Sequence, residues 1–359
     1  MATRDTYLYL PGGTPFDLRV PLIPLTVAVF AVFCVIDLSF ISPTINNDSN
    51  TLLDELWLIT QGSENAYGSY YWSALIFQSI PGSLVLPLVI LIGSLHILIL
   101  FRGSRHWLTL LLCMILILPA LLNFSRPSKE ILLSPVTFLL LGLLCLRLNG
   151  LARVLAVALC YLSYAYFMRE YYLVIFVTFA GLMILAHLPR RLALVALAVA
   201  LGALAFAPAE LFQLVQGPRD YTNALRLAND TVGVRSAFVN PLPPDNLLNF
   251  LYNYGYAAVR LNLPIFFDVR PQEWFLLSVT LTTIGLVCFG LRRGGPAVRA
   301  CALLVLAHMM TLALFEPDLG SYLRHLTSAT IYLAPVLTLF DRRLTEPRPE
   351  PAAAVTSAS

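Results

Sequence analysis

Acidic and basic side chains occur side by side at several short polar links between long apolar segments of this 359-residue chain. Two pairs are Lys129–Glu130 and Arg169–Glu170, and a third link carries Arg324–His325 together with two acids. An arginine or lysine can bind phosphate oxygens, whereas a carboxylate or an imidazole can accept a proton from a hydroxyl group. The transfer of a group from a diphosphate to a hydroxyl acceptor needs both kinds of side chain, so these links are candidate sites for such chemistry.

Lys129 is the single lysine among 23 basic residues, and it lies with Arg126 and Glu130 in the polar link 123–130. Its presence is explained either by chance in an arginine-biased composition or by a need for a compact ammonium group. Glu130 would open the next helix, where the N-terminus favours a negative charge. Arg126 and Lys129 would then bind phosphate oxygens, the arginine as a fork and the lysine as a point charge.

Arg169 and Glu170 lie in a link so short that both charges are expected almost at membrane depth, with Tyr171 directly after them. Charged groups at that depth are costly unless they are paired or face water, so they are functional candidates. The alternative is an Arg169–Glu170 ion pair that only closes the helical hairpin.

Two further links carry candidates. Asp54 and Glu55 lie near the start of an amphipathic helix expected within 46–62, as solvated acids or as catalytic carboxylates. The link 315–325 contains two acids, a tyrosine, an arginine and a histidine. The candidate catalytic residues are Asp54, Glu55, Glu170 and His325, and the candidate substrate-binding residues are Arg126, Lys129, Glu130, Arg169, Tyr171, Asp318, Tyr322 and Arg324.

The composition excludes a water-soluble domain, because the mean hydropathy is +0.77, 58% of residues are hydrophobic and only 12% are charged. Apolar stretches long enough to cross a bilayer recur without strict alternation, which predicts an all-α, polytopic integral membrane protein with about ten transmembrane helices. The expected spans are 21–42, 80–101, 107–123, 131–147, 152–168, 171–188, 192–212, 273–291, 300–315 and 326–340.

The charges predict the orientation of this single transmembrane domain, which extends over 1–345. With both termini cytoplasmic, 14 of the 23 basic residues lie on the inner side in very short segments, as the positive-inside rule requires. Fifteen of the 20 acids lie outside or near the outer ends of spans. The longest outer loop, about 213–272, is expected to be helical and membrane-associated as a lid, with Asp245 capping a helix that begins at Asn246. The tail 346–359 is Pro- and Ala-rich and is expected to be disordered.

This layout resembles that of bacterial polysaccharide-assembly enzymes, the Wzy-like and EpsG-like polymerases, and more distantly the GT-C glycosyltransferases. The polymerase resemblance rests on three elements: Ser128-Lys129-Glu130, Arg169-Glu170-Tyr171-Tyr172 and Tyr322-Leu323-Arg324-His325. The GT-C resemblance rests on Asp54-Glu55 with Trp57 and Gly62, although the large first outer loop and the C-terminal soluble domain of many such enzymes are missing.

The resemblance implies a glycosyltransferase in the bacterial inner membrane that joins polyprenyl-diphosphate-linked sugar units at the outer face. The expected partners are a polyprenyl-diphosphate-linked oligosaccharide, the lipid bilayer and other polysaccharide-assembly proteins. We expect no nucleic acid, cofactor or metal, since no Cys/His pair has zinc spacing. The alternative is a transporter or flippase for an anionic lipid-linked sugar, which should carry polar groups near the bilayer midplane.

Overall fold

The computed structural model describes residues 7–9, 15–36, 47–60, 69–228 and 237–345. Apart from one short antiparallel hairpin, β1 (Tyr7–Tyr9) and β2 (Pro15–Asp17), the described regular structure is helical. The first half contains α1 (Arg19–Val35), α2 (Asn47–Thr60), α3 (Ser69–Gln78), α4 (Gly82–Phe101), α5 (Trp107–Asn123), α6 (Lys129–Cys145), α7 (Gly150–Phe167) and α8 (Tyr171–His187). The second half contains α9 (Arg190–Ala205), α10 (Ala209–Ala228), α11 (Leu247–Asn262), η2 (Pro264–Phe266), α12 (Pro271–Arg293), α13 (Pro296–Phe315), α14 (Leu319–Ala329), η3 (Thr330–Leu333) and α15 (Ala334–Thr345).

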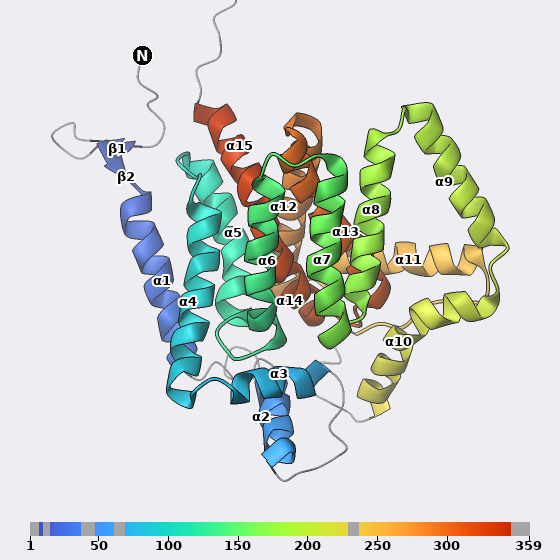
Figure 1. The fold of residues 1–359 in the computed structure, drawn as a ribbon, viewed down its shortest axis with the longest axis horizontal. Coiled ribbons are helices and arrows are strands. Elements are labelled where there is room, and N and C mark those ends of the chain that lie inside the picture. The colour runs from blue at the N-terminus through green and yellow to red at the C-terminus, as the bar shows by residue number, and fades with distance from the viewer. Residues whose placement is uncertain (1–6, 10–14, 37–46, 61–68, 229–236, 346–359) are drawn as a thin grey trace, which may run out of the picture.

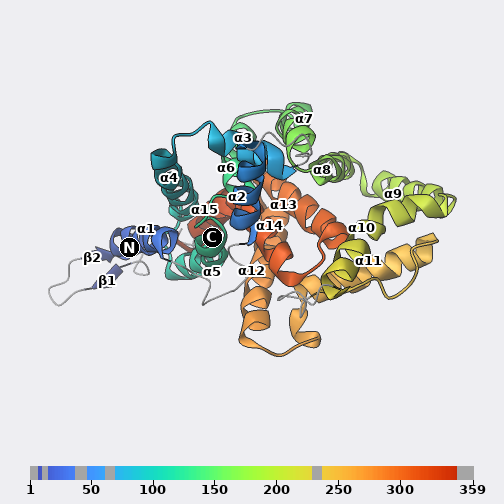
Figure 2. The same cartoon turned by 90° about the horizontal axis from the view of Figure 1, so that it is seen from below.

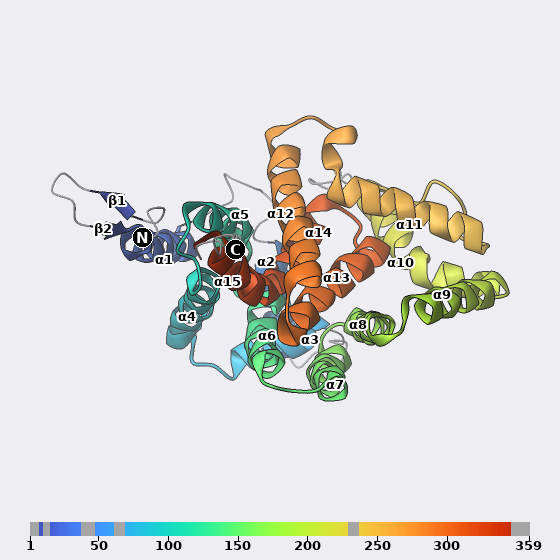
Figure 3. The same cartoon turned by 90° about the horizontal axis from the view of Figure 1, so that it is seen from above.

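Long apolar helices run up and down side by side to form the bundle (Figure 1). The hairpin and the end of α15 lie at its upper end, together with the short links that follow α4, α6, α8 and α12 (Figure 1 and Figure 3). At the lower end, α3 lies across the bundle and α2 extends below it (Figure 1 and Figure 2). The lower end also contains the start of α6, the link between α7 and α8 and the link between α13 and α14.

Helix α13 is the centre of the core and packs against α6, α8, α10, α11, α12, α14 and α15. Its small residues permit close approach, and Ala300, Ala302 and Ala307 have no exposed surface. A similar close contact joins α1 to α4, where a Cβ on Gly93 would lie 2.1 Å from Cζ of the Phe30 ring. Any larger residue at position 93 would therefore displace this ring.

The described helices include four that are long and apolar enough to cross a membrane, or five if a bent pair counts as one span. These apolar helices are compatible with a multi-pass membrane protein. Within the described residues the helices occupy the apolar stretches of the sequence, but two stretches differ from straight spans. The range 192–212 turns by 94° between α9 and α10, and the range 326–340 is divided among α14, η3 and α15. The end of the predicted span 21–42, from residue 37 on, lies outside the described residues.

Helix α9 has no buried residue and stands at the edge of the molecule (Figure 1 and Figure 2). A helix that is apolar on every side and unpacked by its own chain needs a lipid environment or another chain around it.

The loop 213–272 contains the two helices α10 and α11. Helix α11 begins after Asn246, not after Asp245 as the sequence suggested, because Oδ1 of Asn246 accepts a hydrogen bond from the N–H of Asn249 at 3.0 Å. Oδ1 of Asp245 instead accepts from the side-chain amides of Asn246 and Asn249. The tail 346–359 lies outside the described residues.

Candidate functional site

Glu130 is the centre of a buried charged cluster at the lower end of the bundle. Ser128 caps α6, its Oγ accepting from the N–H of Ile131 at 3.4 Å, and this places Glu130 in the first helical turn. The Glu130 side chain is 1% exposed, and its Oε1 lies 2.9 Å from Nη2 of Arg169. The same oxygen lies 3.7 Å from Nε of Arg324 and 3.4 Å from Nε2 of His325. One carboxylate thus joins three segments that are far apart in the sequence.

Arg169 reaches Glu130 from the link between α7 and α8. Its Nη2 donates to Glu130 and its Nη1 donates to the hydroxyl of Tyr171, at 2.9 Å in both cases. The ring of Tyr171 stacks on Phe315 with 6.3 Å between centroids and lies 5.9 Å from the His325 ring. The two hydrogen bonds hold the guanidinium in one orientation, so the ion pair and the aromatic wall form a single unit.

Glu316 and His325 form a second ionisable pair beside Glu130. Glu316 follows the last residue of α13 and is 3% exposed, and its Oε1 accepts a hydrogen bond from Nδ1 of His325. Burial alone would raise the pKa of the Glu316 carboxyl, but His325, then Ser321 and Arg169, bring this pKa below its ordinary value. Glu316 is therefore a carboxylate in the folded protein.

The charge of Glu316 determines which nitrogen of His325 carries the proton. An ionised carboxylate can only accept, so Nδ1 of His325 must be the donor. When the imidazole is neutral, its lone pair is therefore on Nε2, which lies 3.4 Å from Oε1 of Glu130. Nε2 of His325 and Oε2 of Glu130 are both buried without a hydrogen-bond partner among the described residues. Two groups able to accept a proton thus lie beside two arginines.

The side chain of Lys129 contacts α3. Its Nζ donates to Oγ of Ser69 at 2.7 Å and lies 3.1 Å from the centroid of the Tyr70 ring. Its backbone carbonyl accepts from the hydroxyl of Tyr164 at 3.3 Å, which ties α6 to α7. The Lys129 ammonium therefore links α3 to the start of α6, beside the cluster.

The structure thus brings together five of the twelve residues selected from the sequence. They are Glu130, Arg169, Tyr171, Arg324 and His325. The other seven lie elsewhere or have other partners. Glu170 is exposed just before α8, while Arg169, its expected partner, pairs with Glu130.

Three of these residues have structural contacts instead. Nη1 of Arg126 donates to the carbonyl of Cys34 at 2.9 Å. Asp318 caps α14, since its Oδ1 accepts from the N–H of Ser321 at 2.9 Å. The hydroxyl of Tyr322 donates to Oδ1 of Asn262 at 2.8 Å. Asp54 is exposed on α2 and Glu55 is partly buried there, outside the set of residues that meet at Glu130.

Glu316 is the member of the cluster that was not selected. The link 315–325 contains two acids, and Asp318 directly precedes the first residue of α14, where an acid is a typical helix cap. That same pattern indicates a capping role for Asp318 and leaves Glu316 as the acid available to His325. Among the described residues no group of three or more His, Cys, Asp or Glu side chains is arranged to hold a metal ion.

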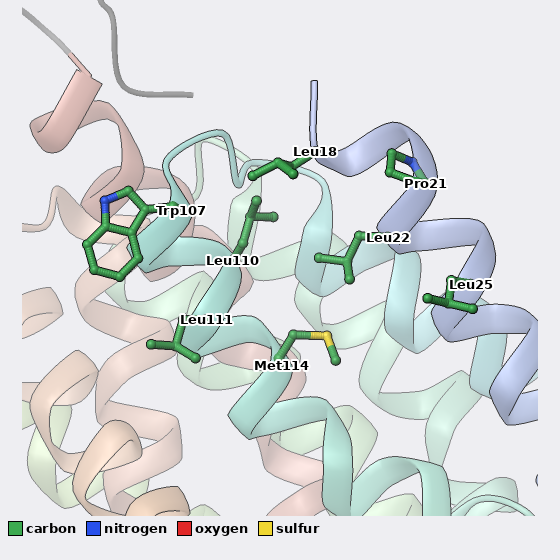
Figure 4. Close-up of a pocket in the computed structure, with 8 residues that line it drawn as sticks. All are labelled: Leu18, Pro21, Leu22, Leu25, Trp107, Leu110, Leu111 and Met114. Atoms are coloured by element: carbon green, nitrogen blue, oxygen red, sulfur yellow. The ribbon is translucent and has the colours of Figure 1, made fainter. Parts of the chain in front are cut away.

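An apolar groove lies elsewhere, in the upper half of the bundle between α1 and α5. It is lined by Leu18, Pro21, Leu22, Leu25, Trp107, Leu110, Leu111 and Met114 (Figure 4). These side chains offer hydrocarbon and sulfur but no charge, so the groove suits a lipid chain and not an ionic reaction. The candidate active site is the Glu130 cluster. Comparison with protein-family models, curated proteins and solved structures found no match to this chain.

Proposed function

We propose that this protein is a membrane-embedded glycosyltransferase of the polysaccharide-polymerase type. It joins polyprenyl-diphosphate-linked sugar units at the outer face of the bacterial inner membrane. The observation that carries the proposal is the meeting of Arg169, Arg324 and His325 around one buried carboxylate, Glu130, beside a second carboxylate, Glu316. The side chains that would bind the diphosphate and those that would accept the proton then lie within reach of the same bond of the substrate.

The cluster matches the charge changes of the proposed reaction. The acceptor hydroxyl loses its proton to Nε2 of His325 as its oxygen bonds to the anomeric carbon of the donor sugar. The bond from that carbon to the diphosphate oxygen breaks, and the diphosphate leaves on its lipid. The protonated imidazole is stabilised by Glu130 and Glu316, which lie on its two sides. Arg324, whose side chain is 28% exposed, and Arg169 neutralise the leaving diphosphate.

The distribution of arginines supports ten spans with both termini in the cytoplasm. The upper-end links and the helix ends beside them carry Arg102, Arg105, Arg147, Arg190, Arg191, Arg292 and Arg293. Short basic loops mark the cytoplasmic side of a membrane protein, so the lower end with the Glu130 cluster faces outward. In this orientation two spans are irregular. One consists of α9 and α10 with the 94° turn between them, and the other consists of α14, η3 and α15.

The test is a transfer assay in proteoliposomes with a purified polyprenyl-diphosphate-linked oligosaccharide, read as a ladder of products. His325→Asn keeps a donor toward Glu316 and removes the base, so we expect the rate to fall by about 100- to 10,000-fold. Arg324→Met should lose the ladder, whereas Arg324→Lys should retain part of it.

Arg270→Met is the matched control, because Arg270 pairs with Asp268 at an exposed position, with 46% of its side chain accessible. Its ladder should equal that of the unaltered protein. Full activity in both His325→Asn and Arg324→Met would contradict the assignment of the site.

A second candidate function is a transporter or flippase for an anionic lipid-linked sugar, and one observation favours it. The hydroxyl of Tyr161 lies 2.7 Å from Nε2 of His308 and 2.9 Å from the hydroxyl of Tyr332. These three side chains are buried on α7, α13 and η3, inside the bundle. Polar groups at that depth occur in transport pathways as well as in helix–helix contacts.

A flipping assay separates the two functions. A fluorescent polyprenyl-diphosphate sugar in the outer leaflet of proteoliposomes is exposed to a membrane-impermeant quencher. Glycosyl transfer without protein-dependent flipping supports the transferase. Flipping that is lost in Tyr161→Phe, without any product ladder, supports the transporter.

A further inference from the structure

The long loop that contains α10 makes direct contact with the link that carries Glu316. Pro317 has no backbone N–H, so the carbonyl of Ala313, four residues earlier, cannot receive its helical hydrogen bond. Nη1 of Arg219 on α10 supplies the missing donor at 3.1 Å. The arginine thus places a positive charge at the C-terminus of α13, where the helix dipole favours it.

Two further bonds hold the carbonyl of Pro317 itself. It accepts from Nδ2 of Asn223 at 2.9 Å and from the backbone N–H of Phe238 at 3.3 Å. Nδ2 of Asn223 also donates to the carbonyl of Phe238, which joins α10 to the segment that follows it. The carbonyls before and after Glu316 are therefore both fixed from outside α13 and α14.

These donors are buried, and they have their own support. Arg219 is 1% exposed and Asn223 is fully buried. Nη2 of Arg219 donates to Oδ1 of Asn240, and its guanidinium lies 4.9 Å from the centroid of the Phe238 ring. Asp220 accepts from the backbone N–H of Asn240 at 2.7 Å and from its side-chain amide at 2.9 Å. We call Arg219, Asn223 and Phe238 the α10 clasp.

We propose that Arg219 and Asn223 are positioning residues that hold the α13–α14 link so that Glu316 meets His325. The effect on catalysis rests on the proposed transferase function, whereas the claim that Arg219 and Asn223 stabilise the α13–α14 link does not. Helix α10 then acts as a fixed support for the site and not as part of a lid. A buried arginine and asparagine that donate to backbone carbonyls leave little freedom for opening.

The first experiment measures directly how firmly the α13–α14 link is held, by backbone hydrogen exchange of the detergent-solubilised full-length protein. Asn223→Asp has the same shape but lacks both donors, and Arg219→Met removes the charged fork at similar length. We expect amides of the segment 316–322 to exchange at least about tenfold faster in both variants. Thr222→Ala is the control, because its hydroxyl bonds only to the carbonyl of Pro218 on its own helix.

The second experiment measures the catalytic consequence in the transfer assay, per folded molecule. A misplacement of a catalytic group by about 1 Å costs on the order of 100-fold in rate, so we expect kcat to fall by about 10- to 100-fold while KM changes little. Arg219→Lys should restore part of kcat. Asn223→Asp added to Glu316→Gln should cause no further loss, because the group to be positioned is already inactive.

The outcomes separate the two claims. Unchanged exchange in Asn223→Asp and Arg219→Met overturns the clasp. Faster exchange with unchanged kcat overturns the positioning role. An unaltered protein that makes no ladder overturns the proposed function, and the exchange rates then still decide whether α10 holds the link.

Discussion

The ion pair between Glu130 and Arg169 permits a quantitative test of the site. Glu130 is 1% exposed and Arg169 is 11% exposed, with 2.9 Å between the charged atoms. Two unit charges about 4 Å apart attract by about 4 kcal/mol at an effective dielectric constant of about 20. Removal of one partner from a buried pair costs about 3–5 kcal/mol, because the other charge stays buried without compensation.

Glu130→Met should show the larger loss, about 4 kcal/mol, since it leaves Arg169 and Arg324 facing each other. Arg169→Met should lose about 3 kcal/mol, because Arg324 and His325 still lie within 3.7 Å of the carboxylate. The double variant should be close to the worse single variant. The expected coupling free energy is therefore about 2–3 kcal/mol.

The assay is unfolding of the detergent-solubilised protein by added SDS, with the free energy of unfolding measured for all four proteins of the cycle. The pair Asp268–Arg270 is the control, since its side chains are 41% and 46% exposed and its coupling should stay below about 1 kcal/mol. Additivity at Glu130–Arg169 within about 0.5 kcal/mol would refute the reasoning.

Three further predictions concern other parts of the structure. The pKa of Glu316 is lowered on folding, so the stability that its carboxylate contributes is complete above its ordinary pKa of 4.5 and is lost as the pH falls through the lowered value. In unfolding curves, the stability difference between the unaltered protein and Glu316→Gln should therefore shrink below about pH 4.5. Asp341 is 2% exposed and accepts from two backbone N–H groups of the α4–α5 link at 2.6 and 2.7 Å, so Asp341→Ala should reduce the unfolding free energy by about 2–4 kcal/mol and Asp341→Asn by less. Lys129→Arg replaces the ammonium that lies 3.1 Å from the Tyr70 ring centroid by a larger planar group, so backbone hydrogen exchange in α3 should become faster; unchanged exchange would show that the compact shape does not matter.

The sequence alone predicted most of the helices and the residue types of the site. Runs of leucine, valine and alanine with few charges predict apolar helices, and α4, α5, α8 and α13 begin and end within a few residues of the predicted ranges. The short charged links also supplied Glu130, Arg169 and His325, which the structure places in one cluster. Both successes depend on local chemistry, since composition and spacing along one segment are enough to recognise them.

The pairing of the charges could not be read from the sequence. Arg169 and Glu170 are neighbours in the chain, but the short turn directs Glu170 outward while Arg169 reaches back to α6. Lys129 is a second example. It is adjacent to Glu130 in the sequence, but its ammonium contacts Ser69 on α3. Adjacent residues at a helix start point in different directions, so sequence neighbours are seldom partners.

Residue types, hydropathy and the positions of prolines and caps determined which segments are helical and which links are charged, because these properties act over a few residues. The tertiary structure decided that Glu130 meets Arg169 and His325, that Glu316 and not Asp318 supports the imidazole, and that α10 holds their link. These contacts join residues 9 to about 200 positions apart, and they exist only once α6, α8, α13 and α14 have packed. Packing around the small residues of α13 sets those positions, and no local pattern specifies it.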